Sequence, residues 1–223
     1  MGADGVEPGE SGRVGRPPRT SASRLEEIGL QLFSSKGFDE TTIDDVAAAA
    51  GIGRRTFFRY FSSKNELVWG DFDGQLARFR QVLAAHENLP LMQALRAGVV
   101  EFNRVDAAEV EQHRRRMHLI FEVPALQAYS TLRYAAWRAV VAEFVAVRTG
   151  AGPSDLLPRL VGHAALAASV AAYEQWLATP GSDLADLLQT SYTELSRGFA
   201  GHGQRTLSRD AGRRSQRRDG VGD

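Results

Sequence analysis

The chain has 223 residues, of which 43% are hydrophobic and 24% charged, a composition typical of a soluble globular protein with one large or two small domains. It contains no cysteine, which excludes disulfides, thiolate metal sites and cysteine nucleophiles and favours a reducing cytoplasm as its location. The 27 basic and 27 acidic residues give a formal net charge of zero. The acidic start lacks the apolar stretch of a signal peptide, and no apolar run approaches the ~20 residues of a membrane helix, so we expect no membrane contact.

The first part of the chain is predicted to be a flexible arm followed by a helix. Residues 1–19 are rich in glycine, proline and arginine, and their arginines either reach into a DNA minor groove or belong to a plain disordered tail. Apolar residues at helical spacing predict a helix over residues 22–35. Gly37 is expected to end it, since a helix C-terminus often needs φ > 0.

Residues 42–64 predict two short helices joined by a tight turn. Thr42 and Asp45 have the spacing of a capping box, which predicts a helix start at this point. Gly51 lies where that helix must end, and a second helix is expected from Arg54 to about Phe61. Helix, glycine turn and helix form a helix-turn-helix arrangement, whose second helix enters the major groove of DNA.

The second of these helices is predicted to have one buried and one outward side. Ile52, Phe57 and Phe61 recur about every four residues and should face the core. The outward side then carries three arginines and an aromatic ring, namely Arg54, Arg55, Phe58 and Arg59. Guanidinium groups can pair with guanine edges or phosphates, and an aromatic ring can pack on a sugar or a thymine methyl. The alternative is a basic surface without a ligand. A local excess of nine basic over six acidic residues in 13–64 favours DNA binding.

The rest of the chain predicts further helices. Ser63 and Glu66 have the spacing of a capping box, which predicts another helix start at this point. Lys64 then lies in the first turn, where the helix N-terminus and its own charge suit a DNA phosphate. Further helices are expected over residues 63–86, 91–104, 107–122, 125–148, 154–178 and 183–199, which makes about nine in an all-α fold. The expected domains are 20–64 and 65–200, followed by a disordered tail over 201–223. The small residues of 154–178 favour close helix packing, so 154–199 either forms a homodimer interface or belongs to the protein's own core.

No catalytic motif stands out, so we expect no enzyme. The larger domain is instead expected to bind a small-molecule effector in an apolar cavity. Candidate lining residues are Phe102, Met117, Phe121, Trp137, Tyr173 and Trp176. Arg114, Arg115 and Arg116 cannot all point the same way on a helix, and one of them, for which we take Arg114, could hold an anionic head group; a solvated basic surface is the alternative.

The run GIGRRTFFRYF from Gly51, followed by Lys64 and Leu67, resembles the DNA-binding signature of the TetR family of transcriptional regulators. With Trp69-Gly70-Asp71-Phe72 it is similar to the subgroup associated with mycofactocin gene clusters. The resemblance implies a ligand-responsive repressor that binds a palindromic operator as a dimer, with a fatty acid or fatty acyl-CoA as a conceivable effector. It implies DNA contacts by a set of residues in and around the second helix, namely Thr42, Gly53, Arg54, Arg55, Thr56, Phe58, Arg59, Tyr60 and Lys64.

Phe58 departs from this pattern, because many family members carry a tyrosine there and use its hydroxyl on a phosphate. Either Arg59 and Tyr60 take over that contact, or position 58 contacts DNA through apolar atoms. The remaining alternative for the whole chain is a helical small-molecule-binding protein or enzyme without a role at DNA.

Overall fold

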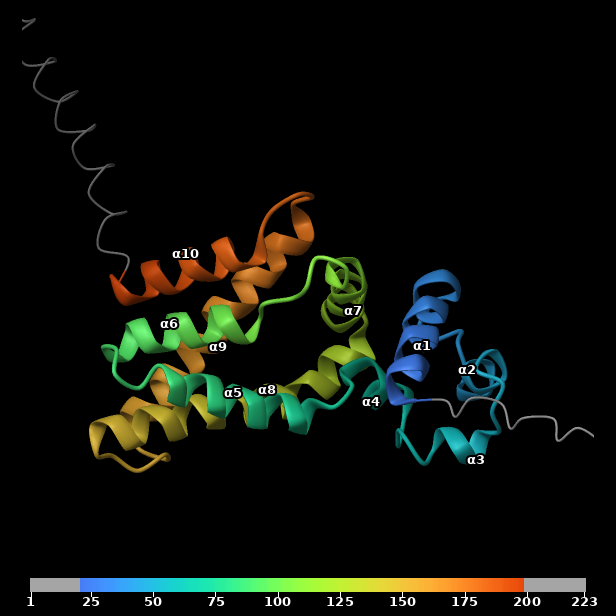
Figure 1. Cartoon of the computed structure of the whole chain (residues 1–223), viewed down its shortest axis with the longest axis horizontal. Coiled ribbons are helices and arrows are strands. Elements are labelled where there is room, and N and C mark those ends of the chain that lie inside the picture. The colour runs from blue at the N-terminus through green and yellow to red at the C-terminus, as the bar shows by residue number, and fades with distance from the viewer. Residues whose placement is uncertain (1–20, 199–223) are drawn as a thin grey trace, which may run out of the picture.

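The computed structural model describes residues 21–198, and every regular element in this range is an α-helix (Figure 1). The all-α fold expected from the sequence is confirmed. The predicted arm (1–19) and tail (201–223) lie outside the described residues. The helices are α1 (Ala22–Lys36), α2 (Ile43–Ala49), α3 (Arg54–Phe57), α4 (Lys64–Trp69), α5 (Phe72–Ala85), α6 (Leu91–Phe102), α7 (Val110–Glu122), α8 (Pro124–Thr149), α9 (Leu156–Ala178) and α10 (Leu184–Ser196).

The start of α2 has the predicted capping box. The Asp45 N–H donates to the Thr42 hydroxyl oxygen at 3.1 Å, and the Thr42 N–H donates to the Asp45 carboxylate at 2.8 Å. Lys36 at the end of α1 adds an ion pair to the same carboxylate, with Nζ and Oδ2 2.9 Å apart. Together these bonds hold the pKa of Asp45 far below its usual value, the Thr42 N–H being the largest cause. The box therefore also fixes α1 against α2.

Helix α3 is shorter than predicted. Gly51, with φ of 67°, ends the preceding helix as expected, and α3 begins at Arg54. After Phe57 the chain tightens, because the Tyr60 N–H bonds to the carbonyl of Phe57, three residues back, at 2.8 Å. The predicted inner side of α3 is confirmed, because Phe57 and Phe61 are buried and Ile52 is partly buried. Phe33, Phe38 and Val46 are buried with them and complete the core of this three-helix unit.

The single helix expected over 63–86 is two helices, α4 and α5. Gly70 ends α4 with φ of 63° and ψ of −152°, a conformation open essentially to glycine alone. Asp71 then starts α5 by accepting the Gly74 N–H at 3.0 Å. The chain thus turns at Gly70, and Trp69 and Phe72 on either side pack edge to face with ring centroids 5.2 Å apart. The other predicted helices have their bounds within a few residues of those observed.

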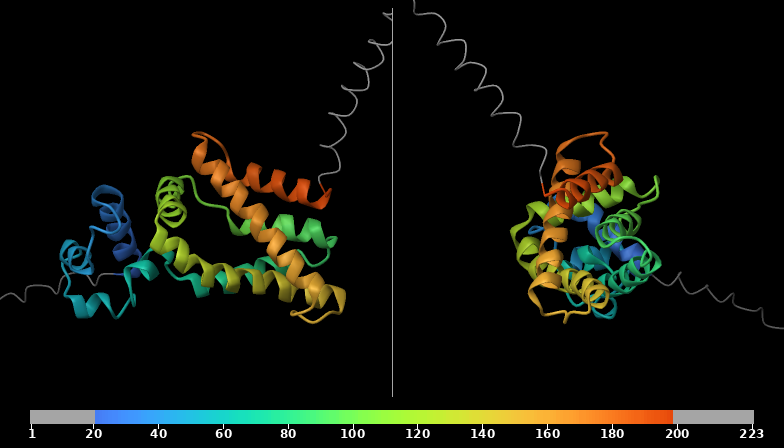
Figure 2. Two further views of the ribbon diagram at one scale, coloured as in Figure 1. Left: turned by 180° about the vertical axis from the view of Figure 1, so that it is seen from behind. Right: turned by 90° about the vertical axis from the view of Figure 1, so that its left-hand side faces the viewer.

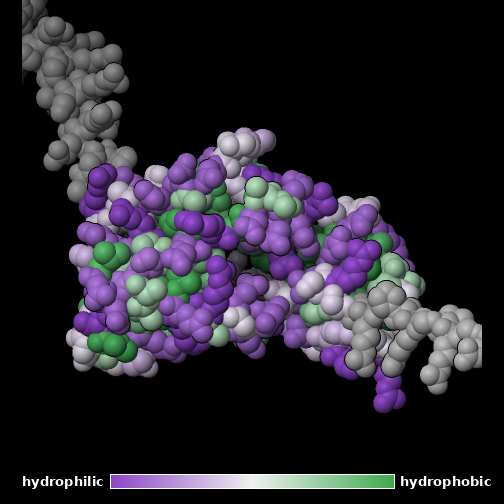
Figure 3. Space-filling model, viewed as in Figure 1, coloured by the Kyte–Doolittle hydropathy of each residue, from purple (hydrophilic) through white to green (hydrophobic). Residues whose placement is uncertain are grey.

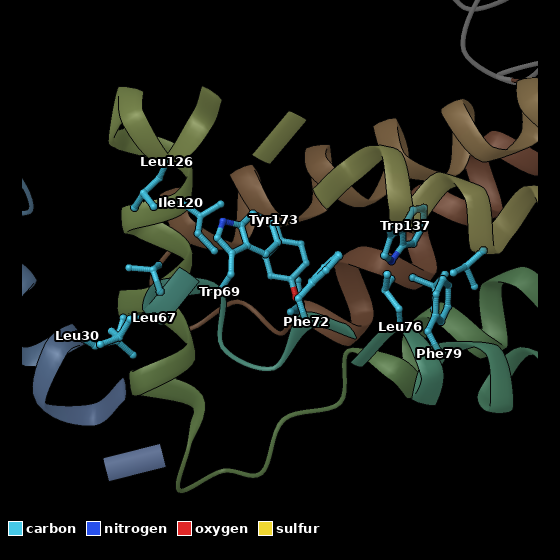
Figure 4. Packing of buried hydrophobic residues seen from close by; sticks show 14 of the residues in the cluster. Leu30, Leu67, Trp69, Phe72, Leu76, Phe79, Ile120, Leu126, Trp137 and Tyr173 are labelled. Atoms are coloured by element: carbon cyan, nitrogen blue, oxygen red, sulfur yellow. The ribbon is translucent and has the colours of Figure 1, made fainter. Parts of the chain in front are cut away.

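The three-helix unit α1–α3 lies at one end of an elongated molecule (Figures 1 and 2). The larger unit is built around α8 and α9, which pack along each other, with α10 on α9 and with α5 and α6 alongside. Helices α4 and α7 join the two units, because α1 packs on both of them. Buried apolar side chains continue through this junction, from Leu30 of α1 past Leu67 and Ile120 to Phe79 and Trp137 (Figure 4).

Helix α9 departs from the expectation that no stretch of the chain is long and apolar enough for a membrane helix. By length and composition alone it could cross a membrane, and one third of its most apolar stretch is buried. Its packing against α8 and α10, with Tyr173 and Trp176 buried, is that of a core helix on one side. The opposite side is exposed, and in the view from behind α9 crosses the surface with no helix in front of it (Figure 2).

Candidate nucleic-acid interface and ligand cavity

The outward side of α3 and the turn after it, here called the arginine face, consists of Arg54, Arg55, Phe58 and Arg59. All four side chains are exposed, and Phe58 is 43% exposed, which is unusual for a phenylalanine. On the inner side Phe57 is 0% and Phe61 5% exposed. The predicted division of this helix into buried and outward sides is confirmed, because the aromatic core holds the arginine face toward solvent.

The arginines of this face differ in how they are held. Arg54 pairs with Asp44 of α2, with Nη1 and Oδ2 2.8 Å apart, and its guanidinium lies 5.4 Å from the centre of the Phe58 ring. Arg55 has no hydrogen bond or ion pair with any residue from 21 to 198 among the interactions found. Its five N–H donors are therefore available to a partner outside the chain. Asp44 was not predicted to have a role here, because it lies ten residues from Arg54 and no local sequence pattern links the two.

Lys64 has a positioning role that the sequence did not predict. Its ammonium donates to the carbonyl oxygens of Phe38 at 2.7 Å and of Thr41 at 3.3 Å, and lies 4.3 Å from the centre of the Phe38 ring. It thereby ties the start of α4 to the α1–α2 connection. The other predicted contact residues lie around the arginine face. Thr42 is engaged in the capping box, and Gly53 is the N-cap residue that precedes α3. Thr56 and Tyr60 are partly buried, and Arg59 lies over the Tyr60 ring.

A cavity of about 590 Å³ lies inside the larger unit and reaches its junction with α1. In the space-filling view the surface is hollowed near the middle of the molecule, below the α6–α7 connection (Figure 3). Five of the predicted effector contacts line this cavity, namely Phe102, Met117, Phe121, Trp137 and Tyr173. Its size is that of a typical small-molecule site. No cluster of three potential metal ligands occurs within residues 21–198.

The three arginines of α7 point in three directions, and the choice of Arg114 needs correction. Arg114 donates to the carbonyl oxygen of Trp176 at 2.6 Å and stacks 4.1 Å from that ring, so neither residue is among those that line the cavity. Arg115 is exposed and pairs with Glu111. Arg116 lines the cavity, because it shares a helix side with His113, Met117 and Ile120 at spacings of three and four.

A neutral hydrogen-bond network lies in the cavity wall. The Tyr173 hydroxyl donates to the Asn103 side-chain oxygen at 2.8 Å, so the His113 Nε2–H donates in turn to the Tyr173 oxygen, 3.1 Å away. Burial, with a smaller contribution from the Arg116 charge, lowers the pKa of His113 to about 4. The imidazole is therefore neutral near pH 7, with Nδ1 as a hydrogen-bond acceptor. Burial likewise raises the pKa of Tyr173.

Arg116 also joins the two units of the molecule. Its Nη2 lies 2.6 Å from the Glu26 carboxylate of α1, and the two side chains are only 18% and 16% exposed. Glu26 was not among the residues predicted to be functional. The two residues lie 90 positions apart in the sequence, so no local sequence pattern could indicate that they pair.

Comparison with known proteins agrees with both halves of this architecture. Residues 27–68 match the family described as bacterial regulatory proteins, tetR family, and residues 89–200 match the family described as MftR C-terminal domain. The chain is 41% identical to the mycofactocin biosynthesis transcriptional regulator MftR of Mycobacterium tuberculosis over 188 residues, which are 84% of this chain and 95% of that protein. It is 28% identical to the regulator TcmR of Streptomyces glaucescens over 76% of this chain and 78% of TcmR.

Solved structures share the fold. A TetR-family regulator from Syntrophomonas wolfei has a TM-score of 0.61 at 14% identity, covering 81% of this chain and 95% of its own. FadR of Thermus thermophilus, a TetR-family repressor solved in complex with lauroyl-CoA, has a TM-score of 0.52 at 23% identity, covering 80% of this chain and 94% of its own.

Proposed function

The chain belongs to the TetR family of bacterial transcriptional regulators, and from this premise we propose that it represses transcription by binding a palindromic operator as a homodimer, until a ligand in the cavity weakens that binding. The observation that carries the proposal is the arginine face, a free and positively charged surface on a helix held by an aromatic core. Such a regulator acts on chromosomal DNA and therefore in the cytoplasm.

We assign base contacts first to Arg55. It has the most freedom, and a guanidinium can bind both acceptors of a guanine edge. Phe58 has no hydroxyl for a phosphate, so its apolar ring would pack on a sugar or a thymine methyl. Arg54, Arg59, Thr42, Gly53, Thr56 and Tyr60 surround this contact, and we propose that they bind the backbone on either side. Lys64 would add a phosphate contact while it holds α4 in place.

The homodimer would form through residues 154–199, mainly through the exposed side of α9. This side carries apolar and small residues one or two turns apart, namely Leu156, Leu160, Ala167 and Ala171, all exposed in the single chain. Exposed apolar stripes of this kind mark protein interfaces, and small side chains allow close helix packing. Two-fold symmetry then presents two copies of α3 to two half-sites.

The effector would be an amphiphile with an anionic head, such as a fatty acid or fatty acyl-CoA. The cavity combines apolar and aromatic walls with three arginines, Arg78, Arg104 and Arg116, which suits an alkyl chain and a negative group. The lauroyl-CoA complex of the structural neighbour FadR supports this ligand class by analogy. The similarity to MftR supports control of mycofactocin-related genes.

Binding to the DNA upstream of the gene tests the proposed function. Fluorescence anisotropy at 50 and 200 mM salt should give tight binding to that DNA, a steep loss of affinity with salt and much weaker binding to unrelated DNA. Deletion of the gene should raise expression of its targets; a fall would indicate an activator. If the protein binds both DNAs equally weakly, it is a small-molecule-binding protein without a role at DNA.

A further inference from the structure

The cavity wall includes residues of the DNA-binding unit itself. Ser23, Glu26 and Glu27 of α1 line it together with Arg104, Glu109 and Arg116 of the larger unit. A ligand that fills this end of the cavity therefore touches α1 directly, without first moving α4.

The Arg116–Glu26 ion pair links the two units across this junction. The pair is short, and water reaches less than a fifth of either side chain. A buried charge that loses its only partner is strongly destabilising, whereas exchange of one anion for another leaves the charge compensated. A second anion that arrives from the cavity can therefore replace Glu26 as the partner of Arg116, which keeps the arginine charge compensated.

Trp69 offers a second, unused polar group in the same wall. Its side chain lines the cavity and is 8% exposed, yet its indole Nε1–H has no hydrogen-bond partner. In the close-up view the Trp69 ring lies between Ile120 and Tyr173 (Figure 4). An unsatisfied buried donor is uncommon in folded proteins and indicates a place for an acceptor atom. Arg116 and Trp69 are thus two hydrogen-bond donors in the wall of the same cavity.

Glu26 also packs on the turn between α4 and α5. Its two carboxylate oxygens would lie 3.1 Å from a Cβ at Gly70, so a side chain there would push the Glu26 carboxylate aside by a few tenths of an ångström. Glu26 therefore contacts both the Arg116 side chain and the α4–α5 turn, which Trp69 directly precedes.

We propose that Arg116 is shared between two anions. It holds Glu26 of α1 when the cavity is empty, and it holds the carboxylate or other anionic head of an amphiphilic ligand, together with the Trp69 Nε1–H, when the cavity is filled. The ligand head repels the Glu26 carboxylate from the common arginine and so shifts α1. This inference rests on the proposed function and adds the residues through which ligand binding reaches the DNA-binding unit.

The sign of each effect follows from competition. Glu26 competes with the ligand for Arg116, so removal of its charge must strengthen anion binding. By linkage, the same change must remove the effect of the ligand on DNA affinity, because the two anions no longer exclude each other. A purely structural ion pair has neither consequence, since its loss weakens binding or leaves it unchanged.

The test compares laurate with its uncharged methyl ester by calorimetry on the full chain, below the micelle concentration. Glu26→Gln should bind laurate at least tenfold more tightly than wild type and bind the ester unchanged. Arg116→Gln should bind laurate at least tenfold more weakly, and Trp69→Phe several-fold more weakly. Glu111→Gln, which removes the same charge from an exposed pair on α7, is the matched control and should change nothing. The double variant Glu26→Gln/Arg116→Gln has no unpaired charge and should fold even if a single variant does not; it should bind laurate and ester alike.

A DNA measurement completes the test. Saturating laurate should lower the operator affinity of wild type at least tenfold and that of Glu26→Gln less than threefold. The proposal is overturned if wild type binds the ester as well as laurate, if Glu26→Gln does not tighten laurate binding, or if that variant still releases DNA like wild type. A chain that binds laurate as expected but no operator would contradict the proposed function and leave the ligand subsite intact.

Discussion

Burial keeps the His113 imidazole neutral, and this has a consequence for stability. The pKa of His113 lies near 4 in the folded chain against about 6.5 in an unfolded one, burial being the main cause and Arg116 the second. Between these values the unfolded chain binds a proton and the folded chain does not. The contribution of His113 to stability is therefore complete above pH 6.5 and is lost as the pH falls toward 4.

His113→Gln should remove this pH dependence. Between pH 7 and pH 5, the free energy of unfolding of wild type is expected to fall by about 2 kcal/mol more than that of the variant. The reason is that glutamine does not titrate, so in the variant the folded and unfolded chains bind the same number of protons at this position. Thermal melts at both pH values measure it. His118→Gln, on a histidine of the same helix whose side chain is 42% exposed, is the control and should melt like wild type at both. Parallel losses in wild type and His113→Gln would show that His113 is not held neutral.

At the residue scale, the sequence predicted the arginine face well and the cavity only in part. Arg55 and Phe58 could be placed outward because Phe57 and Phe61 define the buried side of a short helix. Arg116 lines the cavity in place of the predicted Arg114, because the outcome depends on which side of α7 meets the larger unit. That is decided by packing among distant helices, and no local pattern expresses it.

At the element scale, the break between α4 and α5 is the main departure from the predicted helices. The apolar spacing from Leu67 to Leu83 continues through Gly70 and therefore predicted one helix. The glycine followed by Asp71 was the available signal, since it joins a C-terminal glycine to an N-cap residue. The capping box of α2 was predicted correctly because both partners lie within one turn.

Gly70→Ala should be the most damaging of the turn glycine substitutions. An alanine there must adopt a backbone conformation nearly restricted to glycine and must displace Glu26. Gly150→Ala is the matched control, since Gly150 has a similar φ of 68° but open space around it. We expect the control to lose roughly 1 kcal/mol and Gly70→Ala clearly more, measured by thermal melts. Equal losses would show that the α4–α5 turn is not crowded.

At the scale of the whole molecule, the proposed homodimer presents two copies of α3 together. Leu160→Asp places a charge in the middle of the exposed apolar side of α9, where Leu160 is 58% exposed. If this side is the dimer interface, the variant should be monomeric in light scattering at concentrations where wild type is a dimer, because a buried unpaired charge is costly. Leu132→Asp, on α8 and 72% exposed, should remain dimeric. A dimeric Leu160→Asp would place the interface elsewhere.

The fold of the whole chain was predictable to different degrees in its two units. The three-helix unit follows from caps, turns and spacing within about twenty residues. The junction with the larger unit does not, because Arg116 and Glu26 meet only when α7 is packed on α1. The proposed coupling between ligand and DNA therefore depends on tertiary structure.

Operator affinity of Arg55→Ala tests the central claim most directly. Anisotropy with the upstream DNA should show a loss of about 1–3 kcal/mol in binding free energy and a relaxed sequence preference, as expected for a lost base contact. Arg115→Ala removes the same charge from an exposed arginine of α7 and should bind like wild type. If Arg55→Ala binds the operator with unchanged affinity and preference, the arginine face does not recognise DNA and the account is wrong.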